Sequence, residues 1–238
     1  MPSVLVVLSS HSVLGNTGKP TGWYLPEFAH PYNEFVKAGF TVTVASPKGG
    51  ATPLDPASVE AFKEDPASVE FLNTKKSVYN ETIKLETIAA DQATAAATAT
   101  KYDALFYPGG HGPMYDLAFD KQSHYLAAAF NKAGKVVSAV CHGPAAIVNV
   151  RENPDDESSA FILKGKTVNS FTDDEERAVQ LEKVVPFLLE TRLKEIGATF
   201  VKAGDWQEKV VVDGNIITGQ NPASASGVGA AIVKAVGN

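Results

Sequence analysis

The chain has 238 residues and a formal net charge of -6; 44% of the residues are hydrophobic and 20% are charged, values ordinary for a globular protein. Acidic and basic residues are mixed without a Lys- or Arg-rich stripe, which argues against a nucleic-acid partner. No apolar run approaches the roughly 20 residues needed to span a bilayer, so we expect no membrane segment.

Two aliphatic runs near the start predict buried strands. The first, residues 4–8, has no basic residues before it and indicates a strand rather than a signal peptide. A helical stretch follows Glu27 and stops at Gly39, and residues 40–45 form the second strand.

Residues 51–80 interrupt the alternation of strands and helices. They contain the segment Asp-Pro-Ala-Ser-Val-Glu twice, starting at Asp55 and at Asp65. An N-cap aspartate followed by proline is typical of a helix start, so we expect two short helices here. Insertions of this kind over a sheet often act as lids, and we interpret residues 51–80 as one.

The alternation of strands and helices then resumes and continues to the C-terminus. It predicts one α/β domain, residues 1–238, with a mostly parallel sheet covered by helices on both faces. The remaining strands are expected at 104–107, 136–140, 167–171, 199–202, 209–213 and 215–218, and helices at 121–132, 184–196 and 222–236, with another beginning at 143–144.

The single cysteine, Cys141, lies where the strand at 136–140 gives way to a helix. Ligands of open α/β sheets bind at the carboxyl ends of the strands, and a polar side chain at a sharp strand-to-helix turn is typical of a nucleophile elbow. The helix N-terminus should favour thiolate over thiol. A buried structural cysteine is the alternative, because free cysteine is among the most buried residue types. The context favours a nucleophile.

Two further segments are expected at the same edge of the sheet. His142 either tunes the thiol, moves a proton or caps the helix. Gly109-Gly110 allows close approach of backbone to a ligand, and N–H groups there and at His142 would form an oxyanion hole; a plain turn is the alternative. Gly110, His111 and His142 are therefore candidates for oxyanion or substrate binding. The glycine spacing does not fit a pyrophosphate site.

Glu27 lies in an aromatic segment with Trp23, Tyr24 and Phe28. Partial desolvation there would raise the pKa of its carboxyl towards neutrality, which suits general acid/base catalysis. A surface glutamate in a first helical turn is the alternative, and by pattern alone it is favoured.

We expect neither a metal nor an organic cofactor. One thiol excludes an internal disulfide and a cysteine-rich zinc site, and fits a reducing compartment, with the cytoplasm expected and the nucleus also compatible. The histidines are scattered without a His-x-x-x-His spacing, at His11, His30, His111, His124 and His142.

The assembled motifs resemble the ThiJ/PfpI superfamily, part of the class I glutamine amidotransferase-like (flavodoxin-like) fold. Within it the chain is most similar to the heat-shock-inducible, glutathione-independent glyoxalase III branch, also called D-lactate dehydratase, a lyase. The matching segments are Gly-Trp-Tyr-Leu-Pro-Glu at 22–27, Gly-His-Gly at 110–112, Ala-Val-Cys-His-Gly-Pro at 139–144, Phe-Thr-Asp at 171–173 and Thr-Gly-Gln-Asn-Pro-Ala-Ser-Ala at 218–225.

The resemblance implies a Glu/Cys/His site that maps onto Glu27, Cys141 and His142. It also implies an acidic residue near His142, for which Glu176 is the better match and Glu175 the alternative, because the run at 173–176 departs from the usual pattern. A lid at 51–80 and a homodimer are likewise implied.

The leading hypothesis is conversion of methylglyoxal, or a similar 2-oxoaldehyde, to D-lactate through a Cys141 hemithioacetal, with Glu27 as general acid/base. A stress-induced holdase that binds unfolded client proteins is the first alternative, and would depend on exposed apolar surface rather than on Cys141. A cysteine-dependent peptidase, amidase or deglycase is the second, and would require an acid that orients His142. Oxidation of Cys141 in a redox sensor is also open.

Overall fold

The structure is a computed structural model that describes residues 1–237. In this part of the chain the main sheet has seven strands in the order β3-β2-β1-β4-β5-β9-β8, and a small second sheet pairs β6 with β7. The strands are β1 (Ser3–Val7), β2 (Thr41–Ser46), β3 (Ile83–Lys84), β4 (Ala104–Tyr107), β5 (Val136–Val140), β6 (Thr167–Val168), β7 (Thr199–Phe200), β8 (Val210–Asp213) and β9 (Ile216–Gly219).

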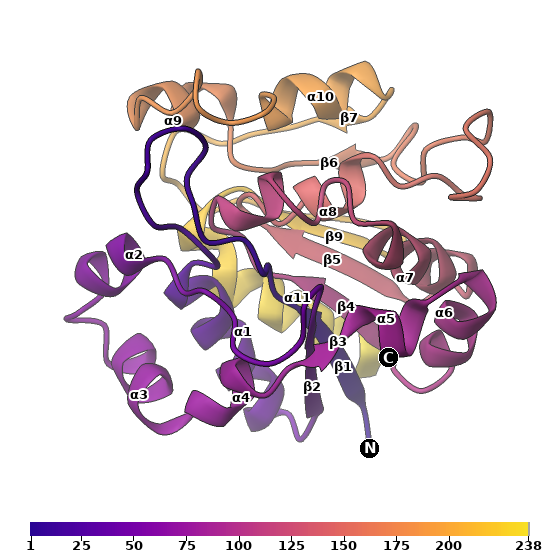
Figure 1. Cartoon of the computed structure of the whole chain (residues 1–238), viewed down its shortest axis with the longest axis horizontal. Coiled ribbons are helices and arrows are strands. Elements are labelled where there is room, and N and C mark those ends of the chain that lie inside the picture. The colour runs from indigo at the N-terminus through magenta and orange to yellow at the C-terminus, as the bar shows by residue number, and fades with distance from the viewer. Residues whose placement is uncertain (238) are drawn as a thin grey trace.

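Helices cover both faces of the main sheet (Figure 1). They are α1 (Leu25–Lys37), α2 (Pro56–Ala61), α3 (Pro66–Thr74), α4 (Lys76–Asn80), α5 (Leu85–Ala89), α6 (Gln92–Ala99), α7 (Lys121–Lys132), α8 (Ala145–Val148), α9 (Asp173–Ala178), α10 (Leu189–Glu195) and α11 (Ala225–Gly237), with 3-10 turns η1 (Gly112–Met114) and η2 (Pro222–Ser224). Among residues 1–237, no helix is long and apolar enough to cross a membrane.

All neighbouring strands of the main sheet are parallel except β8, which runs antiparallel to β9. The central strand β1 pairs Val4 with Val42 of β2 on one side and with Ala104 of β4 on the other. This arrangement confirms the fold class, a mostly parallel sheet with helices on both faces.

Two apolar cores form on the two faces of the sheet. Side chains alternate across β1, so that Val4 and Val6 pack with α1, α3, α4 and α11, whereas Leu5 and Val7 pack with α5 to α8 and α10. Each such aliphatic side chain contributes about 1.5–3 kcal/mol when fully buried. The cores fix β1, β4 and β5 side by side, and their carboxyl ends meet at one edge of the sheet.

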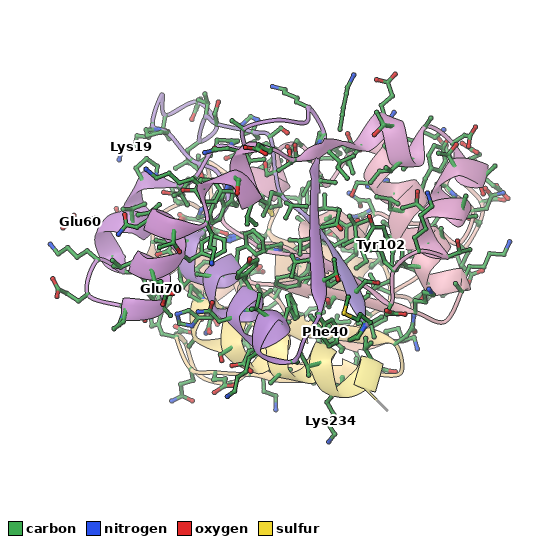
Figure 2. The ribbon with its side chains drawn as sticks, turned by 90° about the horizontal axis from the view of Figure 1, so that it is seen from below. Lys19, Phe40, Glu60, Glu70, Tyr102 and Lys234 are labelled. Carbon is green, nitrogen blue, oxygen red and sulfur yellow. The ribbon has the colours of Figure 1, made fainter. Side chains whose placement is uncertain are left out.

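The segment 51–80 is helical, as expected at both Asp-Pro motifs. Asp55 caps α2 and Asp65 caps α3, each by accepting a backbone N–H bond, and proline occupies the first turn of both helices. The exposed side chains of Glu60 and Glu70 point away from the ribbon (Figure 2). A third helix, α4, was not expected. The one-domain organisation and the lid role stay predictions.

The backbone ties the start of this segment to residues that precede α1. The Trp23 N–H donates to Pro53 O at 3.0 Å, and the Asp55 N–H donates to Trp23 O at 2.9 Å. A Cβ on Gly22 would lie 1.9 Å from the Pro53 oxygen, so this close approach requires glycine. Residues 53–55 therefore lie against the main body.

Several expected boundaries are wrong in the C-terminal half. The strand expected at 167–171 is limited to β6, and it pairs with β7, expected at 199–202, outside the main sheet. Residues 169–171 leave this strand, and the Phe171 N–H reaches the Cys141 carbonyl at the end of β5. The helix expected at 184–196 begins only at Leu189, because Pro186 disfavours helical backbone in the residue before it. The stretch expected to be one helix at 222–236 starts as η2 before α11.

Candidate active site

Cys141 lies at a sharp turn after β5, with the left-handed φ of 61°. Its N–H donates to Gly219 O at 2.9 Å, and its carbonyl accepts the Phe171 N–H at 2.8 Å. The turn requires Gly143, because a Cβ there would lie 2.1 Å from the Tyr107 oxygen. A non-glycine residue in this region of backbone space is strained, and such strain is concentrated at functional sites.

The expectation that a helix N-terminus ionises the sulfur is wrong for the free protein. Burial raises the pKa of the Cys141 thiol well above its usual value, and the neighbouring Glu27 carboxyl raises it further. The helix that follows, α8, has only four residues and starts after the turn at 141–144, so its dipole is small. The His142 N–H acts in the opposite direction but does not offset burial.

Glu27 lies in the first turn of α1 and is completely buried. Its Oε2 accepts the Gly109 N–H at 2.8 Å, and Oε1 has no hydrogen-bonding nitrogen or oxygen partner among residues 1–237. Burial raises the pKa of this carboxyl to about 8, while its contacts with Cys141 and Gly109 act in the opposite direction. At neutral pH Glu27 is therefore mainly a neutral acid beside the thiol, and the surface alternative is excluded.

The Glu176 carboxylate bridges two imidazoles. Its Oε1 lies 2.8 Å from His111 Nε2, and its Oε2 lies 2.6 Å from His142 Nε2. Because an ionised carboxylate only accepts hydrogen bonds, both Nε2 atoms must carry hydrogen. In a neutral His142, Nδ1 then has a free lone pair, and it lies 3.5 Å from Cys141 Sγ. The geometry orients His142 to take the thiol proton.

The two partners in this bridge have opposite electrostatic environments. Burial would raise the pKa of Glu176, but attraction to His142 and hydrogen bonds from both histidines hold it well below its usual value. Burial, together with repulsion from His111, lowers the pKa of His142 despite attraction to Glu176. The bridge is thus an ionised carboxylate with a neutral His142 at neutral pH.

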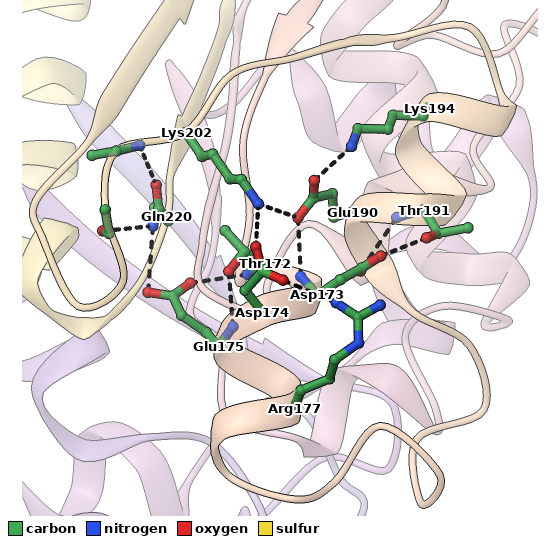
Figure 3. A network of polar contacts seen from close by, with 12 residues as sticks. Thr172, Asp173, Asp174, Glu175, Arg177, Glu190, Thr191, Lys194, Lys202 and Gln220 are labelled. Carbon is green, nitrogen blue, oxygen red and sulfur yellow. Dashed lines mark hydrogen bonds and ion pairs between the residues drawn. The ribbon is translucent and has the colours of Figure 1, made fainter.

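Glu175, the alternative acid, has a different place. Its Oε2 accepts the Thr172 N–H at 2.9 Å, while its own N–H donates to Thr172 Oγ1, which completes a capping box at the start of α9 (Figure 3). Its Oε1 accepts the Trp206 N–H and an Asn221 Nδ2 hydrogen, each at 2.8 Å. The orienting acid beside His142 is therefore Glu176.

The oxyanion site expected at Gly109 needs a correction. The Gly109 N–H is already bound to Glu27 and is not free for a ligand. No backbone or side-chain acceptor within residues 1–237 takes the Gly110 N–H. The His142 N–H points at the sulfur. Gly110 and His142 remain the candidates for an oxyanion site, and Gly109 instead orients the acid.

A cavity of about 100 Å³, which we call the chamber, adjoins these groups. Most of the residues that line it belong to segments singled out in the sequence, but sequence reasoning missed Trp206. The loop that carries Trp206 is distant in sequence from the other site residues and has no recognisable motif. Trp206 has a φ of 63° and packs on Phe171, which in turn packs on His142. The chamber is lined by Tyr24, Glu27, Gly110, His111, Cys141, His142, Phe171, Val179, Trp206 and Pro222.

The model of the DJ-1/PfpI family matches residues 22–235, which is most of the chain and contains every site residue above. The chain belongs to this family. It is 31% identical to "Glyoxalase 3" of Candida albicans, with 94% of each chain covered, and 29% identical to "Glutathione-independent glyoxalase HSP31" of Saccharomyces cerevisiae, with 99% of this chain and 98% of the relative covered. The X-ray structure of the Francisella tularensis Rapid Encystment Protein 24 KDa superposes with a TM-score of 0.88 at 35% identity over the full length of both.

The histidines are scattered in the sequence, a pattern that predicts no metal site. In the folded chain two of them lie together, so their spacing in the sequence does not exclude one. His111, His142 and Glu176 come together, with their ligand atoms within 4.8 Å of one another. Two imidazoles and a carboxylate are a donor set that suits zinc or ferrous iron. Here both carboxylate oxygens are engaged by the imidazole Nε2 atoms. The absence of a metal requirement stays a prediction.

The raised pKa of Glu27 predicts a pH-dependent stability cost. Below pH 4.5 the carboxyl is neutral in both states; between pH 4.5 and 8 the unfolded chain loses the proton and the folded chain keeps it, so the free energy of unfolding falls as pH rises. Glu27→Gln removes this cost, and we expect it to stabilise the fold by about 2–3 kcal/mol at pH 7 and by little at pH 4.5.

Urea unfolding of both proteins between pH 4.5 and 8 measures this difference. Glu60→Gln, at an exposed glutamate, is the control and should show no such trend. A Glu27→Gln effect that is the same at both ends of the pH range would contradict the raised pKa.

Proposed function

We propose that the chain is a cofactor-independent, glutathione-independent glyoxalase of the lyase type that converts methylglyoxal and similar 2-oxoaldehydes to 2-hydroxy acids, D-lactate in the case of methylglyoxal. One observation carries the proposal: the buried Glu27 carboxyl, whose pKa burial raises to about 8, lies beside Cys141 in a chamber of about 100 Å³. A thiol and a carboxyl of raised pKa are the two groups that an internal proton shift between adjacent carbons needs. The glyoxalase names of two relatives that are covered over 94% and 98% of their length support it.

The first step forms the hemithioacetal. Cys141 Sγ adds to the aldehyde carbon C1 while His142 Nδ1 accepts the thiol proton and Glu27 gives its proton to the aldehyde oxygen. Because the thiol loses its proton to His142 while the carbon–sulfur bond forms, the reaction needs no preformed thiolate. This fits the raised pKa of Cys141. Glu176 stabilises the imidazolium that forms at His142.

The second step moves hydrogen from C1 to C2. Glu27, now a carboxylate, removes the C1 proton to give an enediolate and returns it to C2, while the hydroxyl proton on the C1 oxygen passes to the C2 oxygen and C1 becomes the thioester carbonyl. A carboxylate whose conjugate acid has a pKa of about 8 is a stronger base than an ordinary one. The Gly110 and His142 N–H groups are the donors we assign to negative charge that develops on substrate oxygen. Water hydrolyses the thioester that results: the 2-hydroxy acid is released, sulfur recovers its proton from His142, and Glu27 regains one from the acid group that forms.

The peptidase alternative meets its geometric condition, since Glu176 lies 2.6 Å from His142 Nε2. The chamber favours the small carbonyl substrate instead, because Cys141 is only 3% exposed and a polypeptide would have to enter a cavity of about 100 Å³. The chaperone role, a redox-sensor role, the homodimer and the cytoplasmic location stay predictions.

Removal of either central group should abolish the reaction. We expect Cys141→Ala to reduce lactate formation from methylglyoxal to background and Glu27→Gln to reduce kcat by about 10²–10⁴-fold, the usual contribution of a general acid/base. The measurement is D-lactate formation without glutathione. Turnover like that of the wild type in both variants would eliminate this mechanism.

Loss of the orienting carboxylate should be less severe but specific. Glu176→Gln allows the opposite His142 tautomer, with hydrogen on Nδ1, and we expect kcat to fall by roughly 10²-fold, the low end of an acid/base contribution, with a smaller change in KM. Asp174→Asn is the matched control, because this acid lies on the same helix turn and is half exposed. An equal effect of both substitutions would assign the loss to helix α9 rather than to the bridge.

A metal requirement is tested separately. Because every step above uses only side chains and backbone of the chain, we expect dialysis against a strong chelator to leave lactate formation unchanged. Activity that disappears on chelation and returns with zinc would show that His111, His142 and Glu176 hold a catalytic ion.

A further inference from the structure

The chamber beside Cys141 adjoins a second, larger cavity. This cavity, which we call the groove, has a volume of about 390 Å³ and is lined by Tyr24, His30, Phe62, Trp206, Asn221, Pro222 and Ala223. Three of these residues, Tyr24, Trp206 and Pro222, also line the chamber. The chamber and the groove are therefore neighbours that meet at these three side chains.

The two volumes differ in what they can hold. A dry cavity of roughly 150 Å³ accommodates benzene. The chamber, at about 100 Å³, is too small for a ring of that size in addition to the reacting carbons, whereas the groove is more than large enough. A substrate larger than methylglyoxal must place its additional atoms in the groove.

The groove walls are apolar or have satisfied polar groups. Tyr24 and Phe62 meet edge to face with ring centroids 5.9 Å apart. His30 Nε2 is bound to Asp65 at 2.7 Å, and the Asn221 Nδ2 hydrogens go to Glu175 and to the Gln207 carbonyl. Neither of these two residues offers a free charge to a ligand, and the Tyr24 hydroxyl is uncharged because burial raises its pKa, so the walls favour an uncharged, flat or aliphatic group.

Trp206, which borders both the groove and the chamber, is held in place before any ligand binds. Trp206 has left-handed backbone, and its N–H is fixed by the buried Glu175 carboxylate at 2.8 Å. The same carboxylate accepts hydrogen bonds from Gln220 and from Thr172 of the network in Figure 3. A ligand therefore finds a preformed aromatic wall and orders little on binding.

We infer that the groove is a specificity subsite that binds the aromatic or branched aliphatic substituent on C2 of a 2-oxoaldehyde, while the aldehyde itself occupies the chamber. The inference rests on the proposed function and extends its substrate class to arylglyoxals. The overall reaction adds one water to the oxoaldehyde and gives the 2-hydroxy acid with no oxidant or reductant, so phenylglyoxal yields mandelate as methylglyoxal yields lactate. Phe62, on the helical segment 51–80, supplies a groove wall that does not line the chamber.

The test compares kcat/KM for phenylglyoxal and for methylglyoxal in the wild type and in Phe62→Ala. We expect the phenylglyoxal value to fall about tenfold, as loss of one aromatic contact surface implies, and the methylglyoxal value to change less than twofold. Phe119→Ala is the matched control, since Phe119 is also partly exposed and packs on a different ring, Phe187. The ratio of kcat/KM for phenylglyoxal to kcat/KM for methylglyoxal should be the same in Phe119→Ala as in the wild type.

A second variant guards against loss of fold in the first. Ala223 is exposed on the groove wall, and Ala223→Trp should fill the groove, reduce phenylglyoxal turnover at least tenfold and spare methylglyoxal. Unchanged substrate ratios in both folded variants would overturn the subsite, even where methylglyoxal is turned over well. A wild type that converts neither substrate would instead eliminate the proposed function.

Discussion

Left-handed backbone at Cys141 is the constraint on which the site depends. With φ at 61°, the chain leaves β5 abruptly, and the cysteine is fixed by its N–H bond to Gly219 and by the bond from Phe171 to its carbonyl. The turn places the Cys141 sulfur beside the first turn of α1, and it places the next side chain, His142, beside α9. The strain of this conformation is offset by the two packed cores around it.

Two glutamates at this turn are driven to opposite protonation states by their surroundings. Glu27 accepts the Gly109 N–H, contacts the uncharged Cys141 thiol and is otherwise desolvated, so it keeps its proton to about pH 8. Glu176 is almost as buried, but two imidazole donors hold it ionised. Pairs of acids separated in this way commonly divide the acid and orienting roles of a catalytic site. The number of hydrogen-bond donors, two imidazoles for Glu176 against one backbone N–H for Glu27, decides the difference more than depth of burial does.

The sequence carries much of the fold and the core of the site, because both depend on local patterns. Buried parallel strands are continuous aliphatic runs. Gly109-Gly110 and Cys141 follow two such runs, and Glu27 lies at the start of the helix that follows β1. Tertiary contacts decide what was missed. The bridge of Glu176 to His111 joins residues 65 positions apart, and Trp206 reaches the chamber only because Glu175 binds its backbone. The raised pKa of Cys141 depends on complete burial, which no local pattern near a short helix reveals.

The backbone bonds of residues 53–55 to Trp23 restrict how the helical segment 51–80 can move. Trp23 is bonded through both its N–H and its carbonyl, and it lies two residues before α1, whose first turn carries Glu27. A displacement of the whole segment would carry this acid away from the thiol. The contacts continue beyond Asp55, because the Leu25 N–H in the first turn of α1 donates to Ser58 Oγ of α2 at 3.0 Å, and Phe71 of α3 packs on Phe28 of α1. The contacts that hold the segment 51–80 in place thus also hold the helix that carries the proton donor.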